Sequence, residues 1–174
     1  MRTFQDQDGI YGLGEKTGSF NKNGRAWKFW NTDVLNPSVA GGYRETPHAD
    51  PLQDPTSVHF DPYYVSIPFY LHRPSRGTQV GGFFLNNPGR STFDFSKPGE
   101  AALRFEAGGY EEFVFSGPSL PEIIRGYTGL TGRIPLPPLW ALGNHQCRWH
   151  DYTQEQVEAL GRKIRDAKLP CDVL

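Results

Sequence analysis

Between residues 63 and 115, short apolar segments alternate with turn signals about every ten residues, and this rhythm limits the fold more than any other feature of the chain. Segments 91–95 and 101–106 alternate apolar and polar side chains, as strands with one buried face do. Pro, Gly and Asn cluster between the segments, as in residues 86–89. The sequence therefore predicts a mostly β fold, an antiparallel β-sandwich. Residues 9–14 are expected to form a glycine-rich strand or loop, and the expected strands are 26–31, 63–72, 78–85, 91–95, 101–106 and 110–115.

After residue 116 the pattern becomes helical. Ser119 precedes a Pro in the first turn and Glu122, which is typical of a helix start. One apolar face is expected from Ile123, Ile124, Tyr127 and Leu130. Residues 134–138 then hold Pro at three of five positions, which excludes helix and favours an extended connector. We therefore expect a sandwich domain with a C-terminal helix over residues 1–133, joined by this connector to a second domain from residue 139.

Residues 139–174 follow a different order, with one strand, one helix and the start of another strand. Residues 139–148 predict a strand, and Thr153 with Gln156 forms a capping box. A helical stripe that we expect to be buried comprises Val157, Leu160, Ile164 and Ala167. Residues 171–174 predict the beginning of a second strand, so the order is that of one βα unit in a parallel sheet. Because a lone βα unit leaves sheet edges unpaired, we expect a truncated domain.

Bulk composition argues against several classes of protein. Lys and Arg total 18 and Asp and Glu total 19, which gives no support for binding nucleic acid or an anionic membrane. No stretch reaches the roughly 18 apolar residues of a spanning helix. The two cysteines, Cys147 and Cys171, lie in segments expected to be regular and buried. They favour a reducing compartment, and the cytoplasm is the favoured location although the sequence does not determine it.

Phosphate and metal chemistry are both poorly supported. Gly12–Thr17 resembles a phosphate loop, but Glu15 stands where such a loop needs Gly before its Lys. His145, Cys147 and His150 are close in sequence, yet a structural zinc site usually takes four ligands in two pairs. We therefore expect no cofactor and no metal.

Glycosidic cleavage normally needs two carboxyl groups, and the sequence offers no good pair. Glu111 and Glu112 are neighbours on an expected strand and so point to opposite faces. Asp94 lies between two aromatic residues on a strand, and Asp172 lies inside the last expected strand. Aromatic residues make up 14% of the chain, a high content. Sugar-binding sites use aromatic faces, but the cores of β-rich proteins are also rich in aromatic residues.

Four motifs in order resemble glycoside hydrolase family 31, the α-glucosidase-like enzymes. They are Tyr11–Glu15, Phe29–Asp33, Tyr64–Phe69, and Pro137–Gly143 followed by His145–Trp149. Residues 153–174 resemble the first barrel helix and second strand of that family, so the resemblance covers nearly the whole chain. It implies a galactose mutarotase-like β-sandwich, present in part, followed by the first βα unit of a truncated (β/α)8 barrel. It also implies a retaining enzyme that acts on terminal α-linked sugars, commonly glucosides.

The resemblance assigns substrate-binding roles to four residues. Asp33, preceded by Thr32, corresponds to a loop residue that contacts sugar hydroxyls on the leaving-group side. Trp149, preceded by Arg148, corresponds to an aromatic residue that lines the pocket. The family's two catalytic Asp residues have no counterpart in this chain, so we expect the isolated chain to be inactive and to self-associate through exposed barrel-side apolar surface. A non-catalytic carbohydrate-binding sandwich and a structural sandwich remain as alternatives, although neither accounts for residues 134–174.

Overall fold

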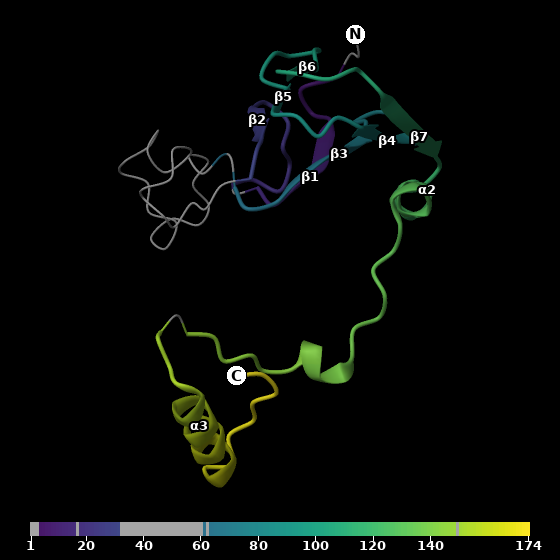
Figure 1. Cartoon of the computed structure of the whole chain (residues 1–174). Coiled ribbons are helices and arrows are strands. Elements are labelled where there is room, and N and C mark those ends of the chain that lie inside the picture. The colour runs from purple at the N-terminus through teal and green to yellow at the C-terminus, as the bar shows by residue number, and fades with distance from the viewer. Residues whose placement is uncertain (1–3, 17, 32–60, 62, 149) are drawn as a thin grey trace. The chain divides into compact units, whose positions relative to one another are not determined.

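The computed structural model describes residues 4–16, 18–31, 61, 63–148 and 150–174 (Figure 1). The chain divides into two compact units, Met1–Gly132 and Arg133–Leu174. Each unit is described by itself below.

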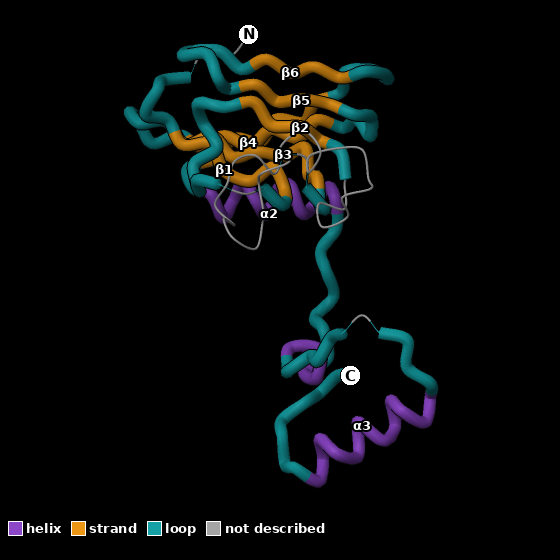
Figure 2. Tube along the Cα trace, turned by 90° about the vertical axis from the view of Figure 1, so that its left-hand side faces the viewer, coloured by secondary structure: helices purple, strands orange, loops and turns teal. Residues whose placement is uncertain are grey.

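The first unit contains two antiparallel sheets that stack face to face (Figure 2). The four-stranded sheet has the order β1 (Gly9–Gly14), β3 (Ser66–Arg73), β4 (Val80–Leu85) and β7 (Glu112–Gly117). The three-stranded sheet has the order β2 (Ala26–Phe29), β5 (Ser91–Asp94) and β6 (Ala102–Phe105). The predicted antiparallel sandwich is confirmed, and its strands differ from the expected bounds by only a few residues at their ends.

Aromatic side chains fill the space between the two sheets. Tyr70 on β3 is 1% exposed, and its ring stacks on Phe83 at a centroid distance of 4.9 Å. The rings of Phe93 and Phe95 meet Tyr70 edge-on at 6.0 and 5.2 Å. Both Phe residues point inward, as the alternation in segment 91–95 predicts. Burying each such side chain stabilises the fold by roughly 1.5–3 kcal/mol, so this cluster fixes the two sheets together.

Helix α2 (Leu120–Thr131) covers the other face of the four-stranded sheet (Figure 2). Ile123 is 1% exposed, and the ring of Tyr127 stacks on Phe69 at 3.9 Å. Gly82 on β4 permits this close approach, because a Cβ there would lie 2.3 Å from a methyl carbon of Ile123. The expected apolar face is wider than the observed one, since Ile124 and Leu130 remain 39% and 49% exposed. The contact with β4 and β7 uses only the side of the helix that carries Ile123 and Tyr127.

The second unit contains a short 3₁₀ helix, η1 (Leu139–Leu142), and the helix α3 (Gln154–Asp166). The predicted capping box is present: the Thr153 hydroxyl accepts from the Gln156 backbone N–H, and the Gln156 side chain accepts from the Thr153 N–H. The strand predicted over residues 139–148 is wrong. Its first residues form η1, and among the described residues only a single parallel bridge joins His145 to Val173.

Three further expectations about the second unit are also wrong. The expected second strand over residues 171–174 is limited to that one bridge, and no residue of α3 is buried; Val157, for example, is 38% exposed. Cys147 is exposed and Cys171 is only half-buried. The common reason is that a parallel strand and its helix become regular and buried only when neighbouring strands and helices cover both faces. Within its described part, this unit supplies one bridge, one short 3₁₀ helix and one α-helix.

Among the described residues, no helix is both long and apolar enough to cross a membrane. The same residues contain no group of three or more His, Cys, Asp or Glu side chains placed to hold a metal ion.

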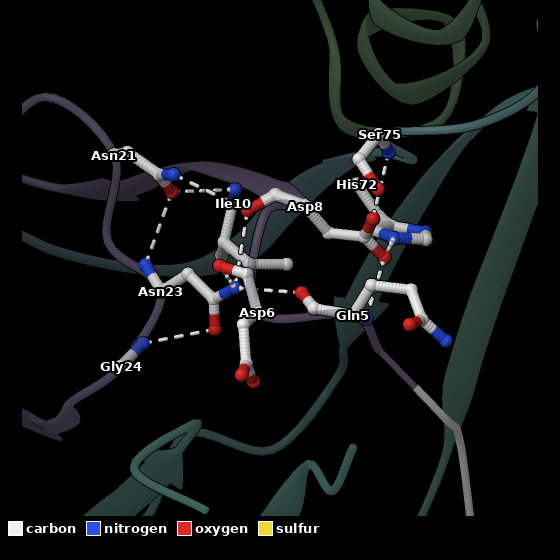
Figure 3. Close-up of polar contacts among 9 residues, drawn as sticks. All are labelled: Gln5, Asp6, Asp8, Ile10, Asn21, Asn23, Gly24, His72 and Ser75. Atoms are coloured by element: carbon white, nitrogen blue, oxygen red, sulfur yellow. Dashed lines mark hydrogen bonds and ion pairs between the residues drawn. The ribbon is translucent and has the colours of Figure 1, made fainter. Parts of the chain in front are cut away.

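A buried carboxylate joins the N-terminal segment to the four-stranded sheet (Figure 3). Asp8 accepts hydrogen bonds from the backbone N–H groups of Gln5 and Ser75, at 3.0 and 2.7 Å. It also contacts Nε2 of His72 at 2.8 Å, and this nitrogen must donate because an ionised carboxylate only accepts. Burial raises the pKa of the Asp8 carboxyl, but the hydrogen bonds outweigh burial and hold that pKa well below its usual range.

We predict that Asp8→Asn lowers the free energy of unfolding by about 1.5–3 kcal/mol at neutral pH, because it removes charge-assisted hydrogen bonds from a buried site. A carboxyl with a depressed pKa stabilises the fold above its unfolded value, about 4, and loses that effect as pH falls. The difference between wild type and variant should therefore shrink below about pH 4. Urea unfolding at several pH values measures it, with the exposed Asp6→Asn as the control. A difference that stays constant down to pH 2.5 would contradict this role.

Candidate functional site

Three of the four predicted substrate-binding residues, Thr32, Asp33 and Trp149, lie outside the described residues. Their predicted roles therefore stay predictions. The fourth, Arg148, is exposed, and its guanidinium lies 6.0 Å from the ring centroid of Tyr152. Arg148 and Tyr152 both line a hollow of about 790 Å³ in the second unit, whose wall also includes Val157 and Ile164 of α3.

The Gly-rich motif at residues 12–14 forms a β-bulge in the edge strand β1. The register against β3 shifts between Gly12 and Gly14, and three consecutive residues have positive φ: 105° at Gly12, 74° at Leu13 and 82° at Gly14. A Cβ on Gly12 would lie 2.9 Å from the Phe69 carbonyl oxygen, so the strand approaches β3 too closely for a side chain. The bulge re-aims the residues that follow it, as bulges near functional sites often do.

Lys16, two residues beyond the bulge, is turned into the sandwich. Its side chain is 0% exposed, and Nζ lies 2.7 Å from a carboxylate oxygen of Asp61 and donates to the carbonyl oxygen of Lys28. The second carboxylate oxygen of Asp61 accepts from the Lys28 N–H at 2.6 Å. Lys16 and Asp61 thus bind both backbone polar groups of Lys28, which lies near the C-terminal end of β2. We call this arrangement the Lys16–Asp61 clasp.

Burial lowers the pKa of the Lys16 ammonium, and the nearby Asp61 carboxylate partly offsets the change. The ammonium also lies 5.0 Å from the ring centroid of Phe29, a favourable cation–π distance. A buried ion pair contributes little net stability relative to an apolar pair, but removing one partner leaves a charge buried without compensation. The clasp therefore holds β2 and residue 61 in one arrangement.

Beyond the clasp, the ends of β2, β3 and β5 surround a cavity of about 340 Å³, which we call the β2 cavity. Asn31 joins two of its walls, because its side-chain oxygen accepts from the backbone N–H of Ser66 at 2.9 Å. Asn87 shapes a third wall by donating to the carbonyl oxygens of Ala107 and Gly109. The described lining carries no ionisable side chain and comprises Phe29, Trp30, Asn31, Ser66, Pro68, Asn87, Pro88, Gly89 and Ser91.

Two hydroxyl groups of this lining have no hydrogen-bond partner. They are the Oγ atoms of Ser66 and Ser91, and they are the buried side-chain polar atoms that remain unsatisfied in the described part of the protein. Ser91 is 3% exposed. An unsatisfied buried hydroxyl costs about 1–3 kcal/mol, and both of these oxygen atoms are closed off from water.

An aromatic side chain with an adjacent cation stands at the same cavity. Trp30 is 46% exposed, and the Arg90 guanidinium lies 4.6 Å from its ring centroid. Arg90 is in turn 3.9 Å from a carboxylate oxygen of Glu106. An exposed pair of this kind is worth about 0.5–1 kcal/mol, enough to favour one orientation of the indole.

The arrangement suits recognition of a neutral polar molecule. No pair of carboxylates suited to glycosidic cleavage occurs around the β2 cavity among the described residues, and the hydroxyl, amide and indole groups are uncharged. Trp30 and Asn31 belong to a motif that the sequence analysis recognised. Ser66 lies in the motif Tyr64–Phe69, although no role was predicted for it. Lys16, Asp61 and Ser91 were missed, because only the fold shows that a Gly–Leu–Gly bulge turns residue 16 inward.

We predict that Lys16→Met lowers the free energy of unfolding by about 3–5 kcal/mol, since it leaves the Asp61 carboxylate unpaired. Lys16→Met combined with Asp61→Asn should be more stable than Lys16→Met alone, because the unpaired charge is removed. Urea unfolding of the wild type, both single variants and the double variant measures this coupling. Additive losses in the double variant would contradict the clasp.

Two family profiles match the chain in order. The N-terminal galactose mutarotase-like domain of glycosyl hydrolase 31 matches residues 2–94, and the TIM-barrel domain of glycosyl hydrolases family 31 matches residues 134–174. Alpha-glucosidase 2 of Bacillus thermoamyloliquefaciens is 34% identical over 175 residues, which cover 100% of this chain and 20% of the relative. An alpha-xylosidase of Lactiplantibacillus pentosus is 30% identical over 94% of this chain and 18% of its own length. The chain thus spans about a fifth of the length of these relatives.

Solved structures agree with the sequence comparisons. The family 31 dextranase of Flavobacterium johnsoniae, complexed with glucose, is 31% identical, with a TM-score of 0.75 over 97% of this chain and 18% of that protein. A family 31 alpha-glucosidase from Bacteroides thetaiotaomicron is 26% identical, with a TM-score of 0.70 over 98% of this chain and 26% of its own length. The profile of the mutarotase-like domain alone spans more than half of the sequence, and the two-sheet sandwich matches these structures. The chain belongs to glycosyl hydrolase family 31.

Proposed function

We propose that this chain is the front part of a retaining glycosidase that cleaves terminal α-linked glucosides. The observation that carries the proposal is the order of the two matches: a mutarotase-like domain followed directly by the start of a family 31 barrel. Relatives that match over nearly the whole chain include an alpha-glucosidase and an alpha-xylosidase. The proposed boundaries are a sandwich domain over residues 1–133, a connector over 134–138, and the start of the barrel from residue 139.

In this proposal the sandwich shapes the sugar site and does not carry out the chemistry. A retaining mechanism needs one carboxyl group as nucleophile and one as acid and base, about 5–5.5 Å apart. We assign both to barrel strands beyond residue 174. This chain contributes binding groups, and those expected to contact the sugar are Asp33, Thr32, Trp149 and Arg148.

Asp33 is the most testable of these groups. It follows Asn31 by two residues, and Asn31 is fixed to Ser66 at the rim of the β2 cavity. In this proposal its ionised carboxylate accepts hydrogen bonds from sugar hydroxyls on the leaving-group side. Trp149 offers an aromatic face for the sugar ring, and Arg148 beside it supplies hydrogen-bond donors.

In the full-length enzyme, Asp33→Ala should reduce kcat/KM for α-linked disaccharides by about tenfold to a hundredfold, as expected for the loss of hydrogen bonds to a charged group. Activity on an aryl glucoside should fall less, because its leaving group offers fewer hydroxyls. Steady-state kinetics on both substrates measures the difference, and Asp6→Ala, at an exposed carboxylate, is the control. Equal kinetics for Asp33→Ala and wild type would contradict the assignment.

We also propose that the isolated 174-residue chain self-associates. Several large apolar side chains of the second unit are almost fully exposed: Ile134 is 92% exposed, Leu136 is 93% exposed and Leu139 is 85% exposed. Sedimentation velocity should show the mean mass rising with concentration, and Leu136→Ser with Leu139→Ser should reduce that rise. A monomer at all concentrations would contradict this proposal.

A further inference from the structure

We propose that Asn23 is a site of spontaneous deamidation, and that the reaction releases residues 4–8, here called the N-terminal segment, from the sandwich. Asn23 and Gly24 form the one Asn–Gly pair in the sequence. Asn23 is half-buried and Gly24 is exposed, so water reaches both residues. Deamidation of an asparagine proceeds through attack by the backbone nitrogen of the next residue, and glycine, which has no Cβ, obstructs this attack least.

The reaction needs only water as its co-reactant. The Gly24 backbone nitrogen loses its proton to water or hydroxide and forms a bond to Cγ of Asn23. The side-chain nitrogen of Asn23 takes up a proton and leaves as ammonia, so the product is a five-membered succinimide ring. Water then opens the ring at either carbonyl carbon, which leaves aspartate or isoaspartate at position 23. No group is oxidised or reduced in these steps.

The fold keeps the two reacting groups close together and also restrains them. The Gly24 nitrogen lies 2.9 Å from the side-chain oxygen of Asn23 and 3.2 Å from the carbonyl oxygen of Phe95. Gly24 has a φ of 82°, and a Cβ there would meet no atom within 4 Å, so the space around this peptide is open. Its N–H donates to the amide oxygen of Asn23, so the side chain must rotate before the nitrogen can attack Cγ.

The N-terminal segment opposes that rotation (Figure 3). Nδ2 of Asn23 donates to the carbonyl oxygens of Gln5, Asp6 and Asp8, at 3.2, 3.5 and 3.1 Å. Rotation of the Asn23 side chain breaks these contacts. The rate of deamidation in the folded chain therefore depends on how often the segment moves away from Asn23, a local opening of the structure.

Deamidation removes the donor on which this contact depends. An amide nitrogen donates to carbonyl oxygens, whereas an ionised carboxylate only accepts. The product therefore places a negative group against the carbonyl oxygens of Gln5, Asp6 and Asp8, and isoaspartate also lengthens the backbone of the turn before β2. Phe4 of the same segment is 5% exposed and belongs to the aromatic core, so release of the segment opens one side of that core.

The first test is incubation of the full 174-residue chain at mildly alkaline pH, followed by peptide mapping with mass spectrometry and an assay for isoaspartate. We expect both products at position 23 and an intact amide at Asn21. Asn21 is a matched internal control, because its Nδ2 also donates to the Asp8 carbonyl but a lysine follows it.

Two treatments test the restraint by the N-terminal segment. Unfolding in urea should raise the rate at Asn23 by about tenfold or more, because it removes every contact of the amide. Asp8→Ala removes the carboxylate that accepts from the Gln5 and Ser75 N–H groups. In the folded chain it should raise the rate by about fivefold or more, because the segment opens more often.

The consequence is tested with Asn23→Asp, which reproduces one product. We expect its melting temperature to fall by about 3–8 °C and the backbone amides of residues 4–8 to exchange hydrogen faster. Asn21→Asp is the control and should change both quantities less. The Asn21 side-chain oxygen accepts from the N–H groups of Ile10 and Asn23, and a carboxylate still accepts from both.

Three results would overturn the proposal. If Asn23 stays unmodified in the folded chain, or changes no faster than Asn21, it is not a preferred site. A rate that neither urea nor Asp8→Ala raises would exclude restraint by the N-terminal segment. An Asn23→Asp variant that melts and exchanges like wild type would show that deamidation does not release the segment. All three results are independent of whether the full-length protein hydrolyses α-glucosides.

Discussion

The Lys16 side chain has no exposed surface, and the end of the sandwich around the β2 cavity depends on how its buried charge is compensated. Lys16 can remain buried because the Asp61 carboxylate and the Lys28 carbonyl oxygen accept hydrogen bonds from its ammonium group. The same Asp61 accepts the Lys28 N–H, so a single charge pair determines where β2 lies relative to residue 61. Any displacement of β2 would break the hydrogen bonds that the Lys28 backbone makes to Lys16 and to Asp61, next to the ring of Phe29.

The bulge in β1 and the aromatic core allow Lys16 to be buried. Gly12 and Gly14 supply positive φ angles for the bulge at the end of β1, and the chain at β3 approaches these residues too closely for side chains. Tyr70, inside the sandwich, keeps the two sheets in contact. The ends of β2, β3 and β5 consequently meet around one uncharged cavity whose rim is the start of the motif that carries Asp33.

The sequence predicted the sandwich well because its signals are local. Alternation in segment 91–95 and turn residues such as Asn86–Gly89 depend on nearest neighbours, and the structure confirms both. It failed over residues 139–148, since a parallel strand depends on partners far along the chain. The site divides in the same way. The motif at residues 29–33 is visible in the sequence. Lys16 and Asp61 are 45 residues apart, so only the fold shows that they form a pair. Only the fold shows that the hydroxyl of Ser91 is buried without a partner.

The central claim is that the β2 end of this sandwich faces the sugar in an α-glycosidase. The most direct measurement is a crystal structure of the full-length protein with an α-linked disaccharide bound. We expect the carboxylate of Asp33 within hydrogen-bonding distance of a sugar hydroxyl on the leaving-group side, with the Lys16–Asp61 clasp intact. A disaccharide held entirely by barrel residues, with Asp33 directed into solvent, would contradict the claim.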